Sequence, residues 1–320
     1  MRGGEREYAT VKPQNVAITG ATGMIGTALT AALRAEGRGV TALTRDAGLA
    51  RRVLPGAGSP DLRVAAYDPL GGDALRAGVE GCDAVVHLAG EPIVGRWTPD
   101  TRRAIGQSRA DGTRRLVAAI AAARDRPRVL VSASAARFYG VSDTAIFDED
   151  SPPGPAWDFL ATVCRAWERE ALAAEALGVR VVILRFGVVL GLTRRMREVL
   201  PSVRRFIGGR VGSGRQWLSW LHLSDAVAVI ERALDDETMR GPYNATAPTP
   251  VPMAQFTAAL GRAAGGVIPV PVPTGIIQRY MGDGATVILD GQRALPKRLI
   301  AAGHQFLEPD IARAAARVLA

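Results

Sequence analysis

The chain has 320 residues, 48% of them hydrophobic and 22% charged, which is the composition of a globular protein with a large core and one or two domains. Its net charge of +9 comes almost entirely from arginine spread along the chain, without the basic, aromatic-interleaved patches of nucleic-acid-binding proteins, so we expect neither a nucleic acid nor a membrane as partner. Two distant cysteines, Cys82 and Cys164, exclude a disulfide framework and have no metal-ligand spacing, which favours a reduced compartment, the cytoplasm, and no metal site.

The first 14 residues are expected to form a mobile tail, because they lack the apolar core of a signal peptide. The longest apolar stretch, near residues 179–192, is interrupted by Arg185 and is not predicted to span a membrane. We therefore expect the folded part of the chain to begin at residue 15.

Residues 15–26, NVAITGATGMIG, predict a buried strand, a glycine turn and the start of a helix that runs to Glu36. Glycine at 20 permits a tight turn, glycine at 23 lets the backbone approach a pyrophosphate, and glycine at 26 lets the helix pack closely on the strand. The unpaired N–H groups of the first helical turn favour an anion there. The alternative is an ordinary turn in which glycine only supplies a positive φ. The expected dinucleotide contacts are Gly20, Thr22, Gly23, Met24, Ile25 and Gly26.

The end of the second predicted strand, Val40–Leu43, distinguishes NAD from NADP. An acidic residue at this point would bind a ribose 2′-hydroxyl and repel a 2′-phosphate. The chain instead has Thr44 and Arg45, and a guanidinium matches a phosphate in a charge-assisted geometry. NADP(H) is therefore the expected cofactor. The alternative is that Arg45 is a surface arginine in an arginine-rich chain.

Strands and helices continue to alternate along the chain, which predicts an α/β fold with a doubly wound parallel sheet of the Rossmann type. Helices are expected at Thr98–Arg124 and from the N-cap Asp158 to about Leu177. Further strands are expected at Leu62–Ala66, Ala84–Leu88, Val129–Val131 and Val179–Leu184. The residues at the ends of two of these strands, which we expect to contact the cofactor, are Asp68, Leu88, Ala89 and Gly90.

Beyond Gly187 the alternation ends, and a smaller, less regular lobe is predicted to lie over the cofactor sheet. Ser224 or Asp225 is the expected N-cap of a helix to about Leu234. The predicted organisation is a tail at 1–14, a nucleotide-binding domain at 15–187 that 224–246 rejoins, and a substrate-binding lobe at 188–223 and 247–320.

Seven motifs along the chain carry a resemblance to a known family: GATGMIG at 20–26, HLAGEPIVGRW at 87–97, SRADGT at 108–113, SASAARFYG at 132–140, DFLATVCRAWEREA at 158–171, GSGRQWLSWLHLSD at 212–225 and GPYNATAPTPV at 241–251. Together they resemble an atypical extended short-chain dehydrogenase/reductase, of the branch of NAD-dependent epimerase/dehydratase-like proteins. The resemblance covers nearly all of residues 15–320. It implies a Rossmann domain, bound NADP and a C-terminal substrate lobe.

The resemblance also implies a catalytic Tyr-x-x-x-Lys pair on the helix that contains Trp167 and Glu168, and that helix has neither a tyrosine nor a lysine. In the wider superfamily the lysine lies beside the tyrosine phenol, favours phenolate and holds the nicotinamide ribose. Aligned on Glu168, the tyrosine and lysine positions fall at Leu160 and Cys164, and no lysine occurs between Lys12 and Lys297. The asparagine usual in the preceding helix is replaced by Arg109. The usual catalytic pair is therefore not encoded.

Ser134, Tyr139 and Arg109 are the candidates to replace the missing pair. Ser134 follows the fifth strand, where the family has its catalytic hydroxyl, and Tyr139 lies in a loop expected to face the nicotinamide. The phenol could exchange a proton only if a cation lowered its pKa, and Arg109 and Arg185, both also expected at the cofactor, are candidates. The alternative is that Tyr139 packs and hydrogen-bonds within the structure.

Five further residues are candidates for contacting a substrate: Glu91, Arg96, Trp97, Trp217 and His222. Glu91 could take a proton and Arg96 could bind an anionic group, although a structural ion pair is an equal alternative. His222, between two leucines, is more typical of a packed histidine than of a base. Aromatic pairs such as Trp217 and Trp220 are more often found in cores than in substrate clefts.

Two functions follow from these residues. The first is an NADP(H)-dependent oxidoreductase or epimerase-like enzyme acting on a small carbonyl or nucleotide-sugar-type substrate, with the cofactor supplying the hydride chemistry. The second is a non-catalytic NADP(H)-binding sensor or scaffold, since a fold does not determine function. The expected partner is a small-molecule substrate, and a homodimer is left open.

Overall fold

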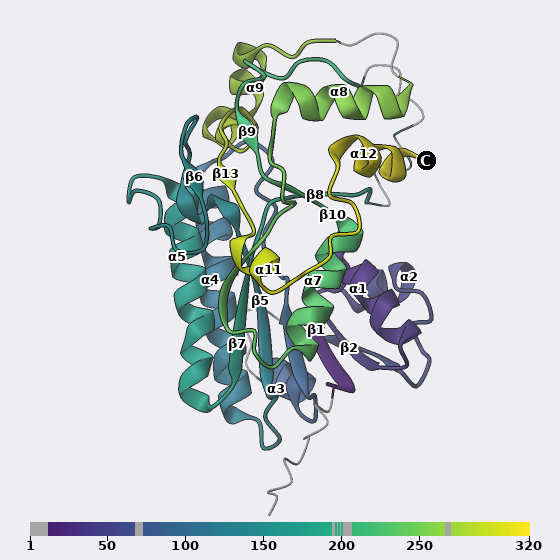
Figure 1. Ribbon diagram of the computed structural model, residues 1–320. Helices are drawn as coiled ribbons and strands as arrows, with labels where there is room; N and C mark the ends of the chain where they lie inside the picture. Colours follow the sequence, from purple (N-terminus) through teal and green to yellow (C-terminus); the bar gives the residue numbers. More distant parts are fainter. Residues whose placement is uncertain are drawn as a thin grey trace, which may run out of the picture.

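The computed structural model describes residues 12–67, 73–193, 207–265 and 270–320, with residues 196, 198 and 200 in between. Within them, a seven-stranded sheet forms the centre (Figure 1), and all its neighbouring strands run parallel. The strands are, in order across the sheet, β11 (Gly241–Ala245), β7 (Arg180–Phe186), β5 (Val129–Ala135), β4 (Ala84–His87), β1 (Asn15–Thr19), β2 (Gly39–Thr44) and β3 (Leu62–Ala66). The order reverses between β1 and β4, the switch point at which doubly wound sheets bind ligands.

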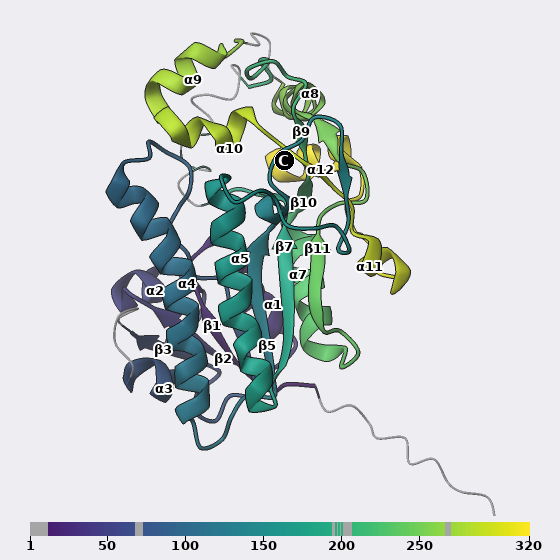
Figure 2. The same ribbon diagram turned by 90° about the vertical axis from the view of Figure 1, so that its left-hand side faces the viewer.

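Helices cover both faces of this sheet. On one face lie α1 (Met24–Ala35), α2 (Ala47–Val53) and α7 (Leu223–Asp235), and on the other lie α3 (Asp73–Val79), α4 (Pro99–Ala122) and α5 (Phe159–Leu172) (Figures 1 and 2). Successive residues of β1 point to opposite faces: Val16 and Ile18 pack in the cluster that contains Leu29 of α1, whereas Ala17 packs with Leu116 of α4. Burial on both faces explains why the strands read as short, nearly continuous apolar runs.

A second, smaller lobe lies beyond the carboxyl ends of the sheet strands, at the top of both views (Figures 1 and 2). Its own core includes Leu218, Trp220 and Ile311. Its two-stranded sheets pair β8 (Val188–Leu190) with β10 (Trp220–His222), β9 (Trp217–Leu218) with β12 (Val251–Pro252), and β6 (Ile146–Phe147) with β13 (Arg293–Ala294). Its helices are α8 (Met253–Ala264), α9 (Thr274–Met281), α10 (Thr286–Leu289) and α12 (Ile311–Leu319), whereas α11 (Lys297–Ala301) packs beside β11 and contributes Leu299 to the core of the central sheet. The chain also forms the 3₁₀ turns η1 (Ala136–Tyr139), η2 (Ala173–Leu177) and η4 (Gly282–Ala285).

The α/β Rossmann fold expected from the sequence is confirmed, and β3 and the N-cap Asp158 lie where they were predicted. The N-cap of α7 was predicted wrongly: the side chain of His222 accepts the N–H of Ser224, while Asp225 is fully buried and accepts two backbone N–H groups from the C-terminal segment. Asp68 lies outside the described residues. No helix in the described part of the chain is long and apolar enough to cross a membrane.

Candidate functional site

The turn after β1 has the backbone geometry that its glycines predict. Gly20 has a φ of +71°, and a Cβ there would lie 2.9 Å from the backbone nitrogen of Ala89. A Cβ on Gly26 would run into the carbonyl oxygen of Gly20 and lie 2.7 Å from Cα of Ala21. Gly23 is the N-cap of α1, so the free N–H groups of the first helical turn open at this turn. The chain therefore provides the cradle that a dinucleotide pyrophosphate requires.

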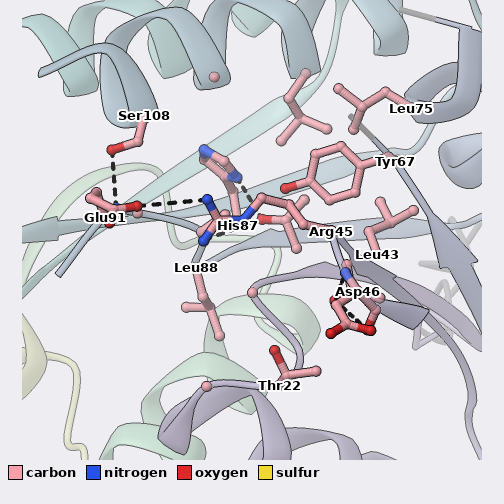
Figure 3. Close-up of a pocket in the computed structure, with 18 of the residues that line it drawn as sticks. Thr22, Leu43, Arg45, Asp46, Tyr67, Leu75, His87, Leu88, Glu91 and Ser108 are labelled. Carbon is pink, nitrogen blue, oxygen red and sulfur yellow. Dashed lines mark hydrogen bonds and ion pairs between the residues drawn. The ribbon is translucent and has the colours of Figure 1, made fainter. Parts of the chain in front are cut away.

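A cavity of about 620 Å³ opens beside this turn, at the carboxyl ends of β1, β2 and β4 (Figure 3). The predicted cofactor and substrate residues that line it are Gly20, Thr22, Gly23, Thr44, Arg45, Leu88, Ala89, Gly90 and Glu91. The predicted cofactor residues that do not belong to its lining are Met24, Ile25, Gly26, Arg109 and Arg185. The lining residues that the sequence analysis did not name include Asp46, Tyr67, His87, Gln107 and Ser108.

Arg45 and Glu91 face one another across this cavity, one at the end of β2 and the other after β4 (Figure 3). Nη1 of Arg45 lies 3.6 Å from Oε2 of Glu91, and the two side chains are 69% and 38% exposed. The backbone of Glu91 is held on both sides, because its N–H donates to Ser108 and its carbonyl accepts from Arg109. The side chain of Arg45 can therefore move away from Glu91, whereas the backbone of Glu91 is held in place.

His87 forms part of the cavity floor and is almost fully buried. Its Nδ1 lies 2.6 Å from Oγ1 of Thr19 and its Nε2 lies 2.9 Å from Oγ1 of Thr113. Burial, together with the nearby charge of Arg109, lowers the pKa of His87 to about 4, so the ring is neutral at neutral pH. The sequence does hold a signal for His87 as a site residue, because it is a polar residue in the last position of a buried strand.

Ser134, Arg185 and Asn244 form one row across three adjacent strands, β5, β7 and β11. Glu168 on α5 packs beside this row and accepts two hydrogen bonds from Arg185, of 2.9 and 2.8 Å, and one of 2.6 Å from the Ser134 hydroxyl. Arg185 also donates to the Tyr139 hydroxyl at 2.9 Å, which in turn donates to Asn244 at 2.7 Å. Each of these side chains is buried, so the row is a closed polar network.

The condition set for Tyr139, that a neighbouring cation brings its pKa down, is not met in this structure. Burial raises it, and although Arg185 acts in the opposite direction, the pKa of Tyr139 is about 12. Arg109 does not contribute as predicted: its Nη1 donates to the carbonyls of Glu91 and Ile105, and its guanidinium lies 5.1 Å from the Trp167 ring centroid. Tyr139 is therefore a hydrogen-bond donor in this structure, not a poised base.

Comparison with known proteins identifies the family. The model of the NAD dependent epimerase/dehydratase family matches residues 16–245. The chain belongs to this family. A second model, described as a domain of unknown function (DUF1731), matches residues 272–318, which run from before α9 into the last turn of α12.

Several relatives match this chain over most of its length. The chain is 40% identical to the Epimerase family protein SDR39U1 homolog, chloroplastic, of Arabidopsis thaliana, over 91% of this chain and 82% of that protein. It is 35% identical to the Epimerase family protein YfhF of Bacillus subtilis, over 96% and 98%. The crystal structure of human epimerase family protein SDR39U1 (isoform2) with NADPH superposes with a TM-score of 0.81 and 33% identity, over 95% of this chain and 99% of that one.

In this epimerase-family member, Leu160 and Cys164, the positions where the resemblance would place the tyrosine and the lysine, lie in apolar clusters. Leu160 packs with Trp97, Ile105 and Val163. Cys164 packs with Phe138 and Tyr139 among others, and burial raises the pKa of its thiol to about 12. Leu160 has no proton to exchange, and Cys164 is a neutral thiol at neutral pH.

The remaining substrate candidates lie apart from the cavity lining. Trp97 is buried and donates to the carbonyl of Ile93, while the exposed Arg96 donates to the carbonyl of Arg279 in α9. The guanidinium of Arg293 lies over the Trp217 ring, 4.4 Å from the ring centroid. His222 caps α7, and burial lowers its pKa. In this structure all four make structural contacts, and their roles toward a substrate stay predictions.

Proposed function

We propose that the protein binds NADP(H) and acts as an oxidoreductase or epimerase-like enzyme on a small carbonyl or nucleotide-sugar-type substrate. The observation that carries the proposal is the glycine turn, where any side chain at Gly20 or Gly26 would collide with backbone, beside a cavity of about 620 Å³. NADP(H) supplies hydride chemistry when bound. The backbone N–H groups at the start of α1 would hold its pyrophosphate, and the Leu88–Gly90 segment would line the opposite side.

Arg45 is the residue that we propose for the 2′-phosphate. It lines the cavity at the end of β2, and its contact with Glu91 is long and exposed to solvent. Exposed ion pairs of this kind contribute about 0–1 kcal/mol, so a phosphate dianion can displace the carboxylate. The NADPH in the human relative supports the same cofactor.

Arg45→Gln should weaken NADPH binding roughly tenfold or more and leave NADH binding nearly unchanged, because only NADPH has the 2′-phosphate. Titration of nucleotide fluorescence measures both dissociation constants, and the difference between them should shrink as salt rises. Arg52→Gln is the matched control: it removes the same charge from an exposed position on α2 that does not line the cavity. Equal losses for the two nucleotides would remove the phosphate argument.

Ser134 and Tyr139 remain the hydroxyls that we propose for proton transfer. Their support is position, at the carboxyl end of β5, and connection, because Glu168 and Arg185 join them into one network. In it the Ser134 proton is held toward Glu168 and the Tyr139 proton toward Asn244. Proton exchange with a substrate would therefore require one of these hydrogen bonds to reorient.

Ser134→Ala and Tyr139→Phe should each lower kcat by about a hundredfold or more if these hydroxyls exchange protons, with little change in the dissociation constant for NADPH. The measurement is NADPH oxidation against a panel of carbonyl compounds and nucleotide sugars. Leu160→Met, which alters the aligned tyrosine position without adding a proton carrier, is the control and should retain turnover. Unchanged kcat in both hydroxyl variants, with a lower melting temperature, would assign them a structural role.

A second candidate function is a non-catalytic NADP(H)-binding sensor or scaffold. The observation that favours it is the packing of Leu160 and Cys164 in apolar clusters, where the wider superfamily has its proton donor and its lysine. The same panel separates the two functions. Saturable NADPH binding without turnover on any member of the panel favours the sensor.

A further inference from the structure

The floor of the nucleotide cavity contains a buried chain of hydrogen bonds that runs through His87. The β1–β4 register places Thr19 directly beside His87. The N–H of Ala89 donates to Oγ1 of Thr19 at 3.3 Å, and the Thr19 hydroxyl meets Nδ1 of His87 at 2.6 Å. On the other side of the ring, Nε2 meets Oγ1 of Thr113 at 2.9 Å. This series of hydrogen bonds thus connects β1, β4 and α4 around the cavity.

The donor and the acceptor of each hydrogen bond in this series follow from counting the available protons. The Thr113 hydroxyl donates to the carbonyl of Arg109 at 2.5 Å, and a carbonyl can only accept, so the single proton of Thr113 is committed there. Nε2 of His87 must therefore be the donor to Thr113. A neutral ring then has a bare Nδ1, which accepts the proton of the Thr19 hydroxyl, and Thr19 in turn accepts from Ala89.

The series of hydrogen bonds ends at the segment that lines the cavity. Arg109, at its far end, donates from Nη1 to the carbonyl of Glu91 at 3.0 Å, and Ser108 receives the N–H of Glu91 at 3.0 Å. The segment from Ala89 to Glu91 is therefore held at its start through Thr19 and at its end through α4. The space beside it is narrow, since a Cβ on Gly20 would lie 2.9 Å from the Ala89 nitrogen.

We propose that His87 is a positioning residue of the nucleotide site, which holds the Ala89–Glu91 segment against the Gly20 turn only as the neutral Nε2–H tautomer. A protonated ring would present a donor to Thr19 and reverse that hydrogen bond. A rotated or deleted ring would leave the Thr19 hydroxyl, which accepts the Ala89 N–H, without the partner that orients it. The low pKa of His87 is consistent with this, because burial and the facing Arg109 guanidinium both disfavour the charged form. The inference rests on the proposed nucleotide site, although the tautomer itself does not.

The tautomer can be read directly by long-range ¹H–¹⁵N NMR, because the chain has three histidines, His87, His222 and His304. His87→Gln assigns the signal. We expect a pyrrole-like Nε2 and a pyridine-like Nδ1, unchanged over about pH 5 to 8, where an ordinary histidine titrates. An Nδ1–H tautomer, or protonation within this range, would overturn the proposal whatever the protein binds.

The positioning role is tested by nucleotide affinity. His87→Phe keeps a planar ring and removes both hydrogen bonds, so it should weaken NADPH and NADH equally, by roughly ten- to a hundredfold. His87→Asn, whose Oδ1 can replace Nδ1 as the acceptor for Thr19, should recover part of this loss. Equal weakening separates this effect from that of Arg45, which concerns NADPH alone.

Thr113→Val and Thr113→Ser provide the same test if His87→Phe does not fold. Valine keeps the shape of threonine and removes the hydroxyl, so it should weaken both nucleotides, whereas serine keeps the hydroxyl and should bind as the wild type does. Folded His87→Phe or Thr113→Val with wild-type affinities would refute the positioning role. Wild-type protein that binds neither nucleotide would instead refute the proposed function, and leave the tautomer measurement standing.

Discussion

Gly26→Ala should abolish tight binding of both NADPH and NADH. The added methyl group would collide with the Gly20 carbonyl and with the backbone of Ala21, so α1 must move away from β1 and carry its N-terminal N–H groups out of position. We expect affinity for each nucleotide to fall about a hundredfold, and the free energy of unfolding to fall by about 1–3 kcal/mol. Fluorescence titration and urea denaturation measure the two effects.

Gly106→Ala is the matched control for this experiment. Gly106 also lies inside a helix, α4, but a Cβ there has no neighbour within 4 Å. The substitution should leave nucleotide affinity unchanged and stabilise the protein by up to about 1 kcal/mol, because alanine is the better helix former. If Gly26→Ala behaved like Gly106→Ala, the close contact of α1 with the turn would not be needed for binding.

Glu168→Gln should cause the largest loss of stability. Its carboxylate is buried and accepts three hydrogen bonds, two from Arg185 and one from Ser134. Removing the charge leaves a buried guanidinium without its counter-ion, which typically costs about 3–5 kcal/mol. The free energy of unfolding from urea denaturation is the measurement. Glu170→Gln, on the same helix but paired with the half-exposed Arg114, should cost less than about 1 kcal/mol.

A double variant tests the physical reason for this loss. Glu168→Gln combined with Arg185→Met removes both buried charges and should regain much of the stability lost in the single variant, since an uncompensated charge costs more than a missing pair. A double variant that is the sum of two large single losses would show that packing, not the unpaired charge, dominates.

The local parts of the nucleotide site could be predicted from the sequence. Gly20 needs a positive φ and Gly26 needs a close approach, and both requirements act within a few residues of the chain. Strands buried on two faces are apolar throughout, so β1 to β4 could be located closely. The C-terminal end of β5 could not be located from the sequence. The strand continues to Ala135 through Ser132 and Ser134, and these polar residues are more typical of a loop than of a buried strand.

The sequence allowed Ser134, Tyr139 and Arg185 of the buried polar network to be named as site residues, but it did not determine what each of them does. Arg185 was a candidate cation for lowering the pKa of Tyr139, and the guanidinium does lie 2.9 Å from the phenol oxygen. Burial decides the outcome, however, and burial depends on Phe147, which stacks on Tyr139, and on Asn244, which is 105 residues away in sequence. No pattern along the chain indicates such partners, because a desolvation cost arises only when distant segments pack together.

The sequence by itself determined the order of strands and helices, the glycine turn, and that helix α5 contains neither a tyrosine nor a lysine. These depend on backbone preferences, on hydrophobic period and on which residue types are present. Only the tertiary structure decided that His87 connects Thr19 to Thr113, that Arg45 faces Glu91, and that His222 caps a helix. The reason is that hydrogen-bond partners and pKa values depend on which side chains meet in the folded protein and on how much water they lose there.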